Sequence, residues 1–260
     1  MESGLSAPDW DAPWYAPWRD AGQAVAGRVA KGLPVHEALN RQDGPHPVRF
    51  VPQDALPEGA AYERFTFEQR QCPTREGLHD FFNGLCWLRF PQAKRRLNAL
   101  QAAQIAAHGV GAVRGPVRDA ITVFDENGAL LDAPAPLWEA LLARQWRRLF
   151  VELRPLWAQA RVVLFGHALL EKLAAPRKDM TAHVWRAPAP LSDLARADAW
   201  LAGALTEDRL AAKPFVPLPV LGVPGWWPAN ADAAFYDDAT VFRPARPVPA
   251  SARAPGAPPA

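Results

Sequence analysis

The chain has 260 residues, of which 49% are hydrophobic and 22% charged, and its formal net charge is +2. This length and composition predict one large globular domain and exclude a chain that is disordered throughout. The charge is too small for the concentrated basic footprint of a nucleic-acid-binding protein, and no apolar run is long enough to predict a membrane span.

Two features indicate a reducing compartment. The N-terminal residues lack the positively charged and apolar regions of a signal peptide. Cys72 and Cys86 form no CxxC pair, and two cysteines in a chain of this length make no disulfide framework. We therefore expect buried free thiols and a cytoplasmic location.

Residues 1–20 combine tryptophans with prolines. Trp10, Trp14 and Trp18 follow a helical spacing, but prolines stand between them, and a proline inside a helix costs about 3 kcal/mol. We therefore expect an extended arm whose indoles lie on the body of the protein. Next, residues 20–40 predict one or two short helices, and residues 44–65 predict a loop with little regular structure.

Residues 72–105 carry the clearest helical pattern. Thr74 is a good N-cap, and the residues after it are apolar on most sides of a helix, which is typical of a buried element. Phe90 should end this helix because the residue before a proline disfavours the helical conformation. Pro91 can begin a second helix, so the segment predicts a helical hairpin.

The middle of the chain predicts three further elements. Residues 118–133 read as a β-hairpin whose turn is formed by residues 125–128, "DENG". Residues 137–153 repeat apolar side chains at helical spacing and predict an amphipathic helix. Residues 162–173 predict a short strand, a turn at Gly166 and a helix that begins at His167. A strand, a glycine and a helix are typical of site-bearing turns, but the absence of a Ser or Cys nucleophile excludes a G-x-S-x-G elbow.

The C-terminal part is rich in proline. After a helix predicted at residues 191–205, residues 213–243 predict an irregular arm that wraps the surface. Its anchors would be Trp226, Trp227, Phe235 and Tyr236. Residues 244–260 contain six prolines and no acidic residue, and they predict a disordered tail. The predicted fold is therefore α+β, a mainly helical single domain over residues 21–243 with a small β-hairpin or sheet and long proline-rich irregular arms.

Four blocks of the sequence support a resemblance. They are "TREGLHDFFNGLCWLRFPQAKRRLNALQA", "RDAITVFDENG", "FGHALLEKL" and "PLPVLGVPGWWPANADAAFYDDATVFRP". In this order they resemble a bacterial family described as domain of unknown function 3025, over about residues 10–245. The resemblance implies no activity, because none is established for the family. Where the family pattern leads us to expect "LNARH", residues 97–101 read "LNALQ", which weighs against an essential role for Leu100 and Gln101.

Polar residues inside apolar segments are the candidate site. The candidate catalytic residues are His79, Asp80, Asn83, Arg118, His167 and Glu171. The candidate metal ligands are His79, His167 and His183. Imidazoles and carboxylates are ligands that suit zinc, manganese or iron, and a bound metal lowers the pKa of its water to about 7. The resulting hypothesis is hydrolysis at a divalent metal, with His167 or Glu171 as the base and Arg118 orienting a small anionic substrate.

Three alternatives stay open. In the first, the polar groups form a buried structural network in which Asp80 pairs with Arg75 or Arg118, and Glu171 pairs with Arg177, since a buried charge needs a partner. A metal-free site could bind an anion where His167 begins a helix. Finally, the chain could be a non-catalytic interaction protein whose aromatic arms dock a protein partner.

Overall fold

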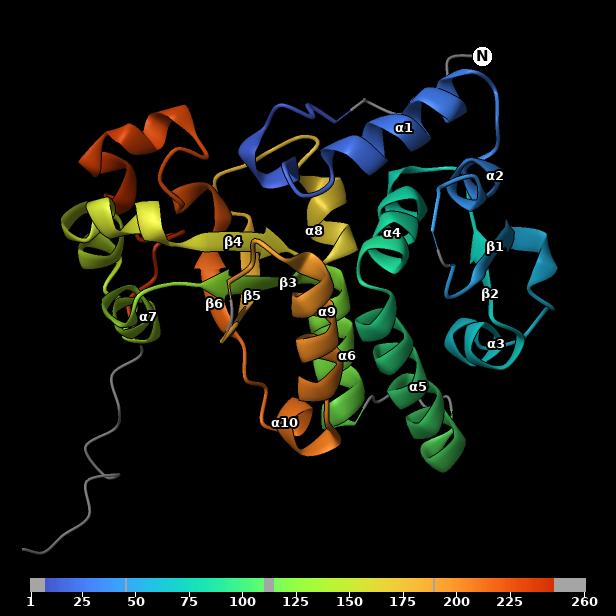
Figure 1. Ribbon diagram of the computed structural model, residues 1–260. Coiled ribbons are helices and arrows are strands. Elements are labelled where there is room, and N and C mark those ends of the chain that lie inside the picture. Colours follow the sequence, from blue (N-terminus) through green and yellow to red (C-terminus); the bar gives the residue numbers. More distant parts are fainter. Residues whose placement is uncertain (1–7, 45, 110–114, 189, 246–260) are drawn as a thin grey trace, which may run out of the picture.

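The computed structural model describes residues 8–44, 46–109, 115–188 and 190–245 (Figure 1). The larger of two sheets contains β3 (Gly128–Asp132), β4 (Arg161–Leu164), β5 (Thr181–Arg186) and β6 (Val216–Pro219) in the order β4-β3-β5-β6. Strand β3 runs antiparallel to β4 and parallel to β5, which is itself antiparallel to β6. The smaller sheet pairs β1 (Arg49–Pro52) with β2 (Gln71–Thr74) in parallel.

Helices make up most of the rest. Beside the larger sheet lie α6 (Pro116–Asn127), α8 (His167–Lys172) and α9 (Leu194–Ala204), and on the far side of these helices lie α4 (Leu78–Arg89) and α5 (Pro91–His108) (Figure 1). The others are α1 (Arg19–Ala30), α2 (Val35–Asn40), α3 (Tyr62–Gln69), α7 (Ala135–Leu142) and α10 (Glu207–Ala211). This arrangement confirms the predicted α+β class with a mainly helical body. Within the described residues, no helix is long and apolar enough to cross a membrane.

Helix α4 lies at the centre of the core, as its sequence predicts. Phe82, Leu85 and Cys86 are fully or almost fully buried, and Cys72 and Cys86 are both free thiols. The helix ends at Phe90 as expected, but it begins after Gly77, because residues 71–74 are taken up by strand β2. The N-cap prediction for Thr74 was therefore wrong.

The predicted helical hairpin was also wrong. After the bend at Phe90, α5 continues away from α4 instead of folding back along it (Figure 1). The two helices have different neighbours: α5 is tied to α3 by the bond from Asn98 Nδ2 to Glu63 O (2.7 Å). The carboxylate of Asp198 in α9 accepts hydrogen bonds from the first backbone N–H groups of α5, at 3.0 Å and 2.8 Å. Such a cap stabilises the helix start.

The predicted β-hairpin at residues 118–133 is instead a helix followed by a strand. Val117, Ala120, Ile121 and Phe124 are buried along one face of α6, and their spacing of i, i+3, i+4 and i+7 is helical. Only residues 128–132 form a strand, β3, which pairs with β4 and β5. The "DEN" residues therefore end a helix and form no hairpin turn.

Two more segments differ from their predictions. The helix expected at residues 137–153 stops at Leu142, and Arg144 adopts a left-handed conformation with φ of 50°. The chain then turns so that Trp146 Nε1 donates to Arg243 O (2.7 Å), a contact that sequence periodicity does not encode. The loop expected at residues 44–65 contains β1 and the start of α3.

The terminal segments pack on the body. Trp14 and Trp18 are buried, and the segment around Pro13–Tyr15 forms turns with a short 3-10 helix. Tyr15 stacks on Phe82 and donates from its hydroxyl to Leu170 O (2.7 Å) in α8. Residues 213–243 form β6 and several 3-10 turns, with Tyr236 buried. Most of the predicted tail, residues 246–260, lies outside the described residues.

Candidate functional site

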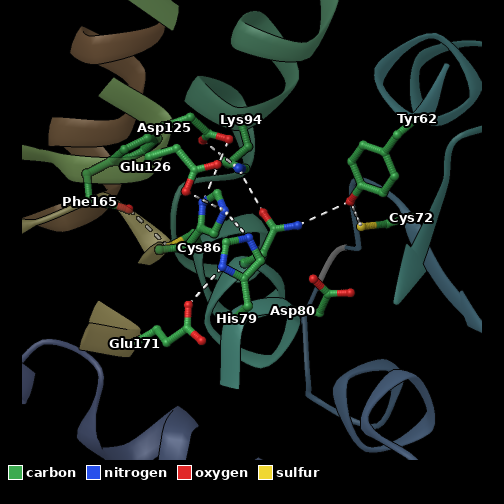
Figure 2. Close-up of polar contacts among 12 residues, drawn as sticks. Tyr62, Cys72, His79, Asp80, Cys86, Lys94, Asp125, Glu126, Phe165 and Glu171 are labelled. Atoms are coloured by element: carbon green, nitrogen blue, oxygen red, sulfur yellow. Dashed lines mark hydrogen bonds and ion pairs between the residues drawn. The ribbon is translucent and has the colours of Figure 1, made fainter. Parts of the chain in front are cut away.

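A cavity of about 390 Å³ opens among α3, α4, α5, α6 and the start of α8. Its wall is unusually polar for a space beside the core. The polar and charged lining residues are Gln53, Tyr62, Glu63, Arg75, His79, Asp80, Asn83, Lys94, Asn98, Gln101, Thr122, Asp125, Glu126 and His167. Figure 2 shows part of this wall, with the carboxylates of Asp125 and Glu126 and the Lys94 ammonium gathered on one side of His79.

Two imidazoles meet in this wall. The Nε2 atoms of His79, in the first turn of α4, and of His167, the first residue of α8, are 3.2 Å apart. Glu126 is the second-last residue of α6, and its Oε2 atom lies 3.5 Å from His167 Nε2. Ligand-type atoms of these three residues all lie within 4.8 Å of one another.

The turn between β4 and α8 brings His167 to the end of α6. Phe165 and Gly166 both donate their backbone N–H to Gly128 O, at 2.9 Å and 2.8 Å. A Cβ atom on Gly166 would lie 2.5 Å from backbone atoms of Glu126 and Asn127. Glycine is therefore required for this close approach of the two backbones.

A carboxylate lies near the Nδ1 atom of each imidazole. Glu171, one turn after His167 in α8, lies 2.8 Å from His79 Nδ1 through its Oε2 atom (Figure 2). Because a carboxylate only accepts, His79 Nδ1 carries a proton, and in the neutral ring Nε2 then presents a lone pair. The predicted pairing of Glu171 with Arg177 was wrong, since Arg177 pairs with Asp179.

The other imidazole is less completely bonded. His167 is buried, and its Nδ1 atom lies 3.8 Å from Asp125 Oδ2 without any hydrogen-bond partner among the described residues. Burial lowers the pKa of His167 to about 3, although the Asp125 carboxylate raises it. The ring is therefore neutral near pH 7.

Lys94 provides a buried positive charge beside these groups. Its side chain is only 4% exposed, and its Nζ donates to Asp125 Oδ1 (2.6 Å) and Asn83 Oδ1 (2.9 Å). Burial alone would raise the pKa of Asp125, but Lys94 and His167 outweigh that effect and hold the pKa below its usual value. For Glu126, burial and the Asp125 carboxylate raise the pKa.

The network continues from Asn83 to a thiol. Asn83 Nδ2 donates to the Tyr62 hydroxyl (3.2 Å), which lies 3.1 Å from Cys72 Sγ (Figure 2). Burial raises the pKa of the Cys72 thiol to about 11. Since this thiol is protonated and buried near pH 7, it is a structural group here and no nucleophile.

The structure brings together most of the candidate residues, but not all. His79, Asp80, Asn83 and His167 line the cavity, with Glu171 behind His79. Asp80 is held by Arg75, whose Nε and Nη2 both donate to its carboxylate at 3.0 Å, as the structural alternative predicted.

Arg118 and His183 lie apart from the cavity wall. The Nη1 atom of Arg118 donates to Gly109 O (3.3 Å) near the far end of α6. His183 is on β5, in register with Gly128 and Pro217, and is not part of the His79–Glu126–His167 group. Arg118 is therefore not placed to orient a substrate in this cavity, and His183 is not placed to share a metal with the other two histidines.

Sequence reasoning missed Lys94, Asp125 and Glu126. The acidic pair was interpreted as turn residues, whereas the buried helical spacing of α6 would have placed both at a helix end beside Gly166. Lys94 gave no comparable signal, because its partners Asn83 and Asp125 are 11 and 31 residues away.

All of these residues lie in a segment that matches a known protein family. The sequence model of the family described as Protein of unknown function (DUF3025) matches residues 48–246. The chain belongs to this family. The resemblance to this family is thus confirmed over residues 48–246. This segment contains every residue of the cavity, whereas α1 and α2 precede it. Searches of curated proteins and of solved structures found no match.

Proposed function

We propose that this DUF3025 protein binds one divalent transition-metal ion through His79, Glu126 and His167 and uses it for hydrolysis. The observation that carries the proposal is the separation of 3.2 Å between the two Nε2 atoms. Two nitrogens bound at about 2.0–2.1 Å to one tetrahedral ion are separated by about 3.3 Å. The imidazoles therefore already stand at the spacing of neighbouring ligands.

The proton positions favour a cation between these nitrogens. In the neutral His79 ring, Nε2 presents a lone pair because Nδ1 donates to Glu171. If His167 carried its proton on Nε2, its buried Nδ1 would face the Asp125 carboxylate with a lone pair and no donor. The tautomer with the proton on Nδ1 removes that conflict, and it leaves lone pairs on two nitrogens 3.2 Å apart, which a metal ion between them would satisfy.

The surrounding carboxylates match the supports found around metal-bound histidines. A ligating histidine usually donates its second N–H to a carboxylate or carbonyl, which fixes the ring and raises its basicity. Glu171 fills this role for His79, and Asp125 faces the corresponding nitrogen of His167. The set of two histidines and one glutamate is also that of hydrolytic zinc sites, which keep a position open for water.

The chain's own residues would complete the chemistry. A metal held here lowers the pKa of a bound water to about 7 and polarises a substrate carbonyl or phosphoryl oxygen. The cavity beside these three residues is also lined by Lys94, Asn98 and Gln101, whose ammonium and amide groups would contact a bound substrate. Asp125 and Asn83 fix Lys94 in place, so its charge is pre-oriented.

The test of this function is metal-dependent turnover. Purified protein would be assayed with a panel of p-nitrophenyl esters and phosphate esters after chelation and after reloading with Zn²⁺, Mn²⁺ or Fe²⁺. We expect hydrolysis that returns on reloading and that is lost in His79→Ala and His167→Ala. The proposal fails if no ester is turned over in a metal-dependent way by folded protein.

The competing hypothesis is a structural, non-catalytic network. It draws support from the pairing of Asp80 with Arg75 and of Lys94 with Asp125. It predicts that histidine substitutions change stability alone and that the protein has no affinity for divalent metals. The docking version of this hypothesis is disfavoured, since Trp14 and Trp18, which would form part of the docking arm, are buried against the chain itself.

A further inference from the structure

A second cavity, of about 470 Å³, lies on the other side of α5. It is bounded by the C-terminal half of α3, the residues before β1 and the first half of α5. Trp87 and Asn98 line both cavities and so form the partition between them. A volume in this range is typical of sites for small ligands.

The charge in this second cavity is of one sign. Arg70, Arg95 and Arg96 line it, and none of its lining residues is acidic. Among the residues that the structure describes, no carboxylate lies within salt-bridge distance of these three arginines; Arg96 Nε donates to Leu205 O (2.9 Å). Like charges in a concave site repel one another and concentrate the field, which attracts anions.

Two further features are found in the wall of this cavity. Thr66 is buried in its wall, and its Oγ1 has no hydrogen-bond partner among the described residues. Arg70 has a positive φ of 51°, which a non-glycine residue adopts only at a cost. That conformation is held because Arg49 N donates to Arg70 O (2.8 Å).

We propose that Arg70, Arg95 and Arg96 bind the phosphate group of a small phosphate-bearing molecule. Guanidinium groups present several N–H donors in a plane and match the oxygens of phosphate. The assignment is independent of the proposed metal site, from which Trp87 and Asn98 separate it.

The experiment is a calorimetric titration of the full chain with inorganic phosphate and with pyrophosphate, in the presence of a chelator. We expect saturable binding of one equivalent, tighter for pyrophosphate and weaker at higher salt. Arg95→Gln and Arg96→Gln should each weaken it about tenfold, the effect of losing one charge-assisted hydrogen bond. Arg161→Gln, which removes an exposed arginine on β4 outside this cavity, should leave it unchanged.

Three results would overturn the assignment. The first is an absence of saturable phosphate binding by folded protein. The second is equal weakening by Arg161→Gln and by the two cavity variants, which would indicate a nonspecific charge effect. The third is binding that disappears when the chelator is added, because the anion would then be held by a metal ion. Thermal unfolding of each variant verifies that the fold is intact.

Discussion

His79 Nε2 and His167 Nε2 face each other across 3.2 Å, although the two residues are 88 positions apart in the chain. One ring is fixed by Glu171, and the other is buried beside Asp125. The relationship requires either a shared proton or a shared cation. The predictions below distinguish a metal site from a network that only supports the fold.

Glu171 is the positioning residue for His79. Replacing it with alanine removes the acceptor on His79 Nδ1, and we expect zinc affinity to fall about 10- to 100-fold. Glu171→Gln keeps an acceptor oxygen and should retain more of the affinity than Glu171→Ala. Calorimetric zinc titrations measure both. Glu139→Ala, which removes an exposed glutamate on α7, serves as the control, and an equal loss in this variant would contradict the assigned role.

Gly166 should not tolerate a side chain. An alanine Cβ at this position would lie 2.5 Å from the backbone of Glu126 and Asn127, so α8 would have to move away from α6. We expect Gly166→Ala to weaken zinc binding at least about tenfold and to lower the free energy of unfolding.

Gly203 offers a matched control for that change. It lies inside α9, and a Cβ there meets nothing within 4 Å. Gly203→Ala should stabilise the protein by about 0.5–1 kcal/mol and leave zinc binding as it is. Calorimetry and urea unfolding of both variants test the pair, and normal metal affinity in Gly166→Ala would contradict the described contact.

The free energy of unfolding should decrease at acid pH because of the lowered pKa of His167. Burial lowers the pKa of His167 from 6.5 to about 3, so between these values the unfolded chain binds a proton that the folded chain does not. The free energy of unfolding therefore decreases as the pH falls below 6.5, by about 1.4 kcal/mol per pH unit.

The measurement is urea unfolding of metal-free protein at pH 6.5 and about pH 5. Wild-type protein should lose about 2 kcal/mol that His167→Gln does not lose. Asp125, whose pKa is lowered, contributes in the same direction but only as the pH falls toward its own range. Identical losses in wild type and variant would show that His167 is not the group responsible.

Lys94 should stabilise the fold because it neutralises the Asp125 carboxylate. Lys94→Met leaves the Asp125 carboxylate without its 2.6 Å ion pair, and we expect a loss on the order of 2–3 kcal/mol. The double variant Lys94→Met/Asp125→Asn should recover part of that loss, because no unpaired charge remains. Urea unfolding of the two single variants and the double variant completes the cycle, and purely additive effects would argue against the pairing.

The correct predictions concern elements whose structure depends on residues close together in the sequence. The β4 strand, Gly166 and helix α8 were predicted because an apolar run, a glycine and a helical repeat are each legible within a few residues. The same is true of the helix end at Phe90 and the buried face of α4. His79, His167 and Glu171 were predicted as site residues for this reason, since α4 carries the first and α8 carries the other two.

The wrong predictions concern segments whose structure depends on contacts between residues far apart in the sequence. Residues 71–74 look like a helix start but pair with β1 as a strand. Residues 118–127 alternate in a way that suggests a hairpin, yet the buried apolar side chains of α6, Val117, Ala120, Ile121 and Phe124, follow a helical spacing. Because α6 was misassigned, Glu126 was not considered as a ligand. His183 and Arg118 were chosen because they are polar residues inside apolar segments, which gives no information on distance.

Metal stoichiometry tests the central claim most directly. Chelated protein would be titrated with Zn²⁺ by calorimetry, with His79→Ala, His167→Ala and Glu126→Gln as variants and His183→Ala as the control outside the site. The account predicts one zinc ion per chain, binding abolished in the two histidine variants and weakened in Glu126→Gln, and no change in His183→Ala. Folded wild-type protein that binds no zinc, or His79→Ala and His167→Ala variants that still bind one equivalent, would contradict it.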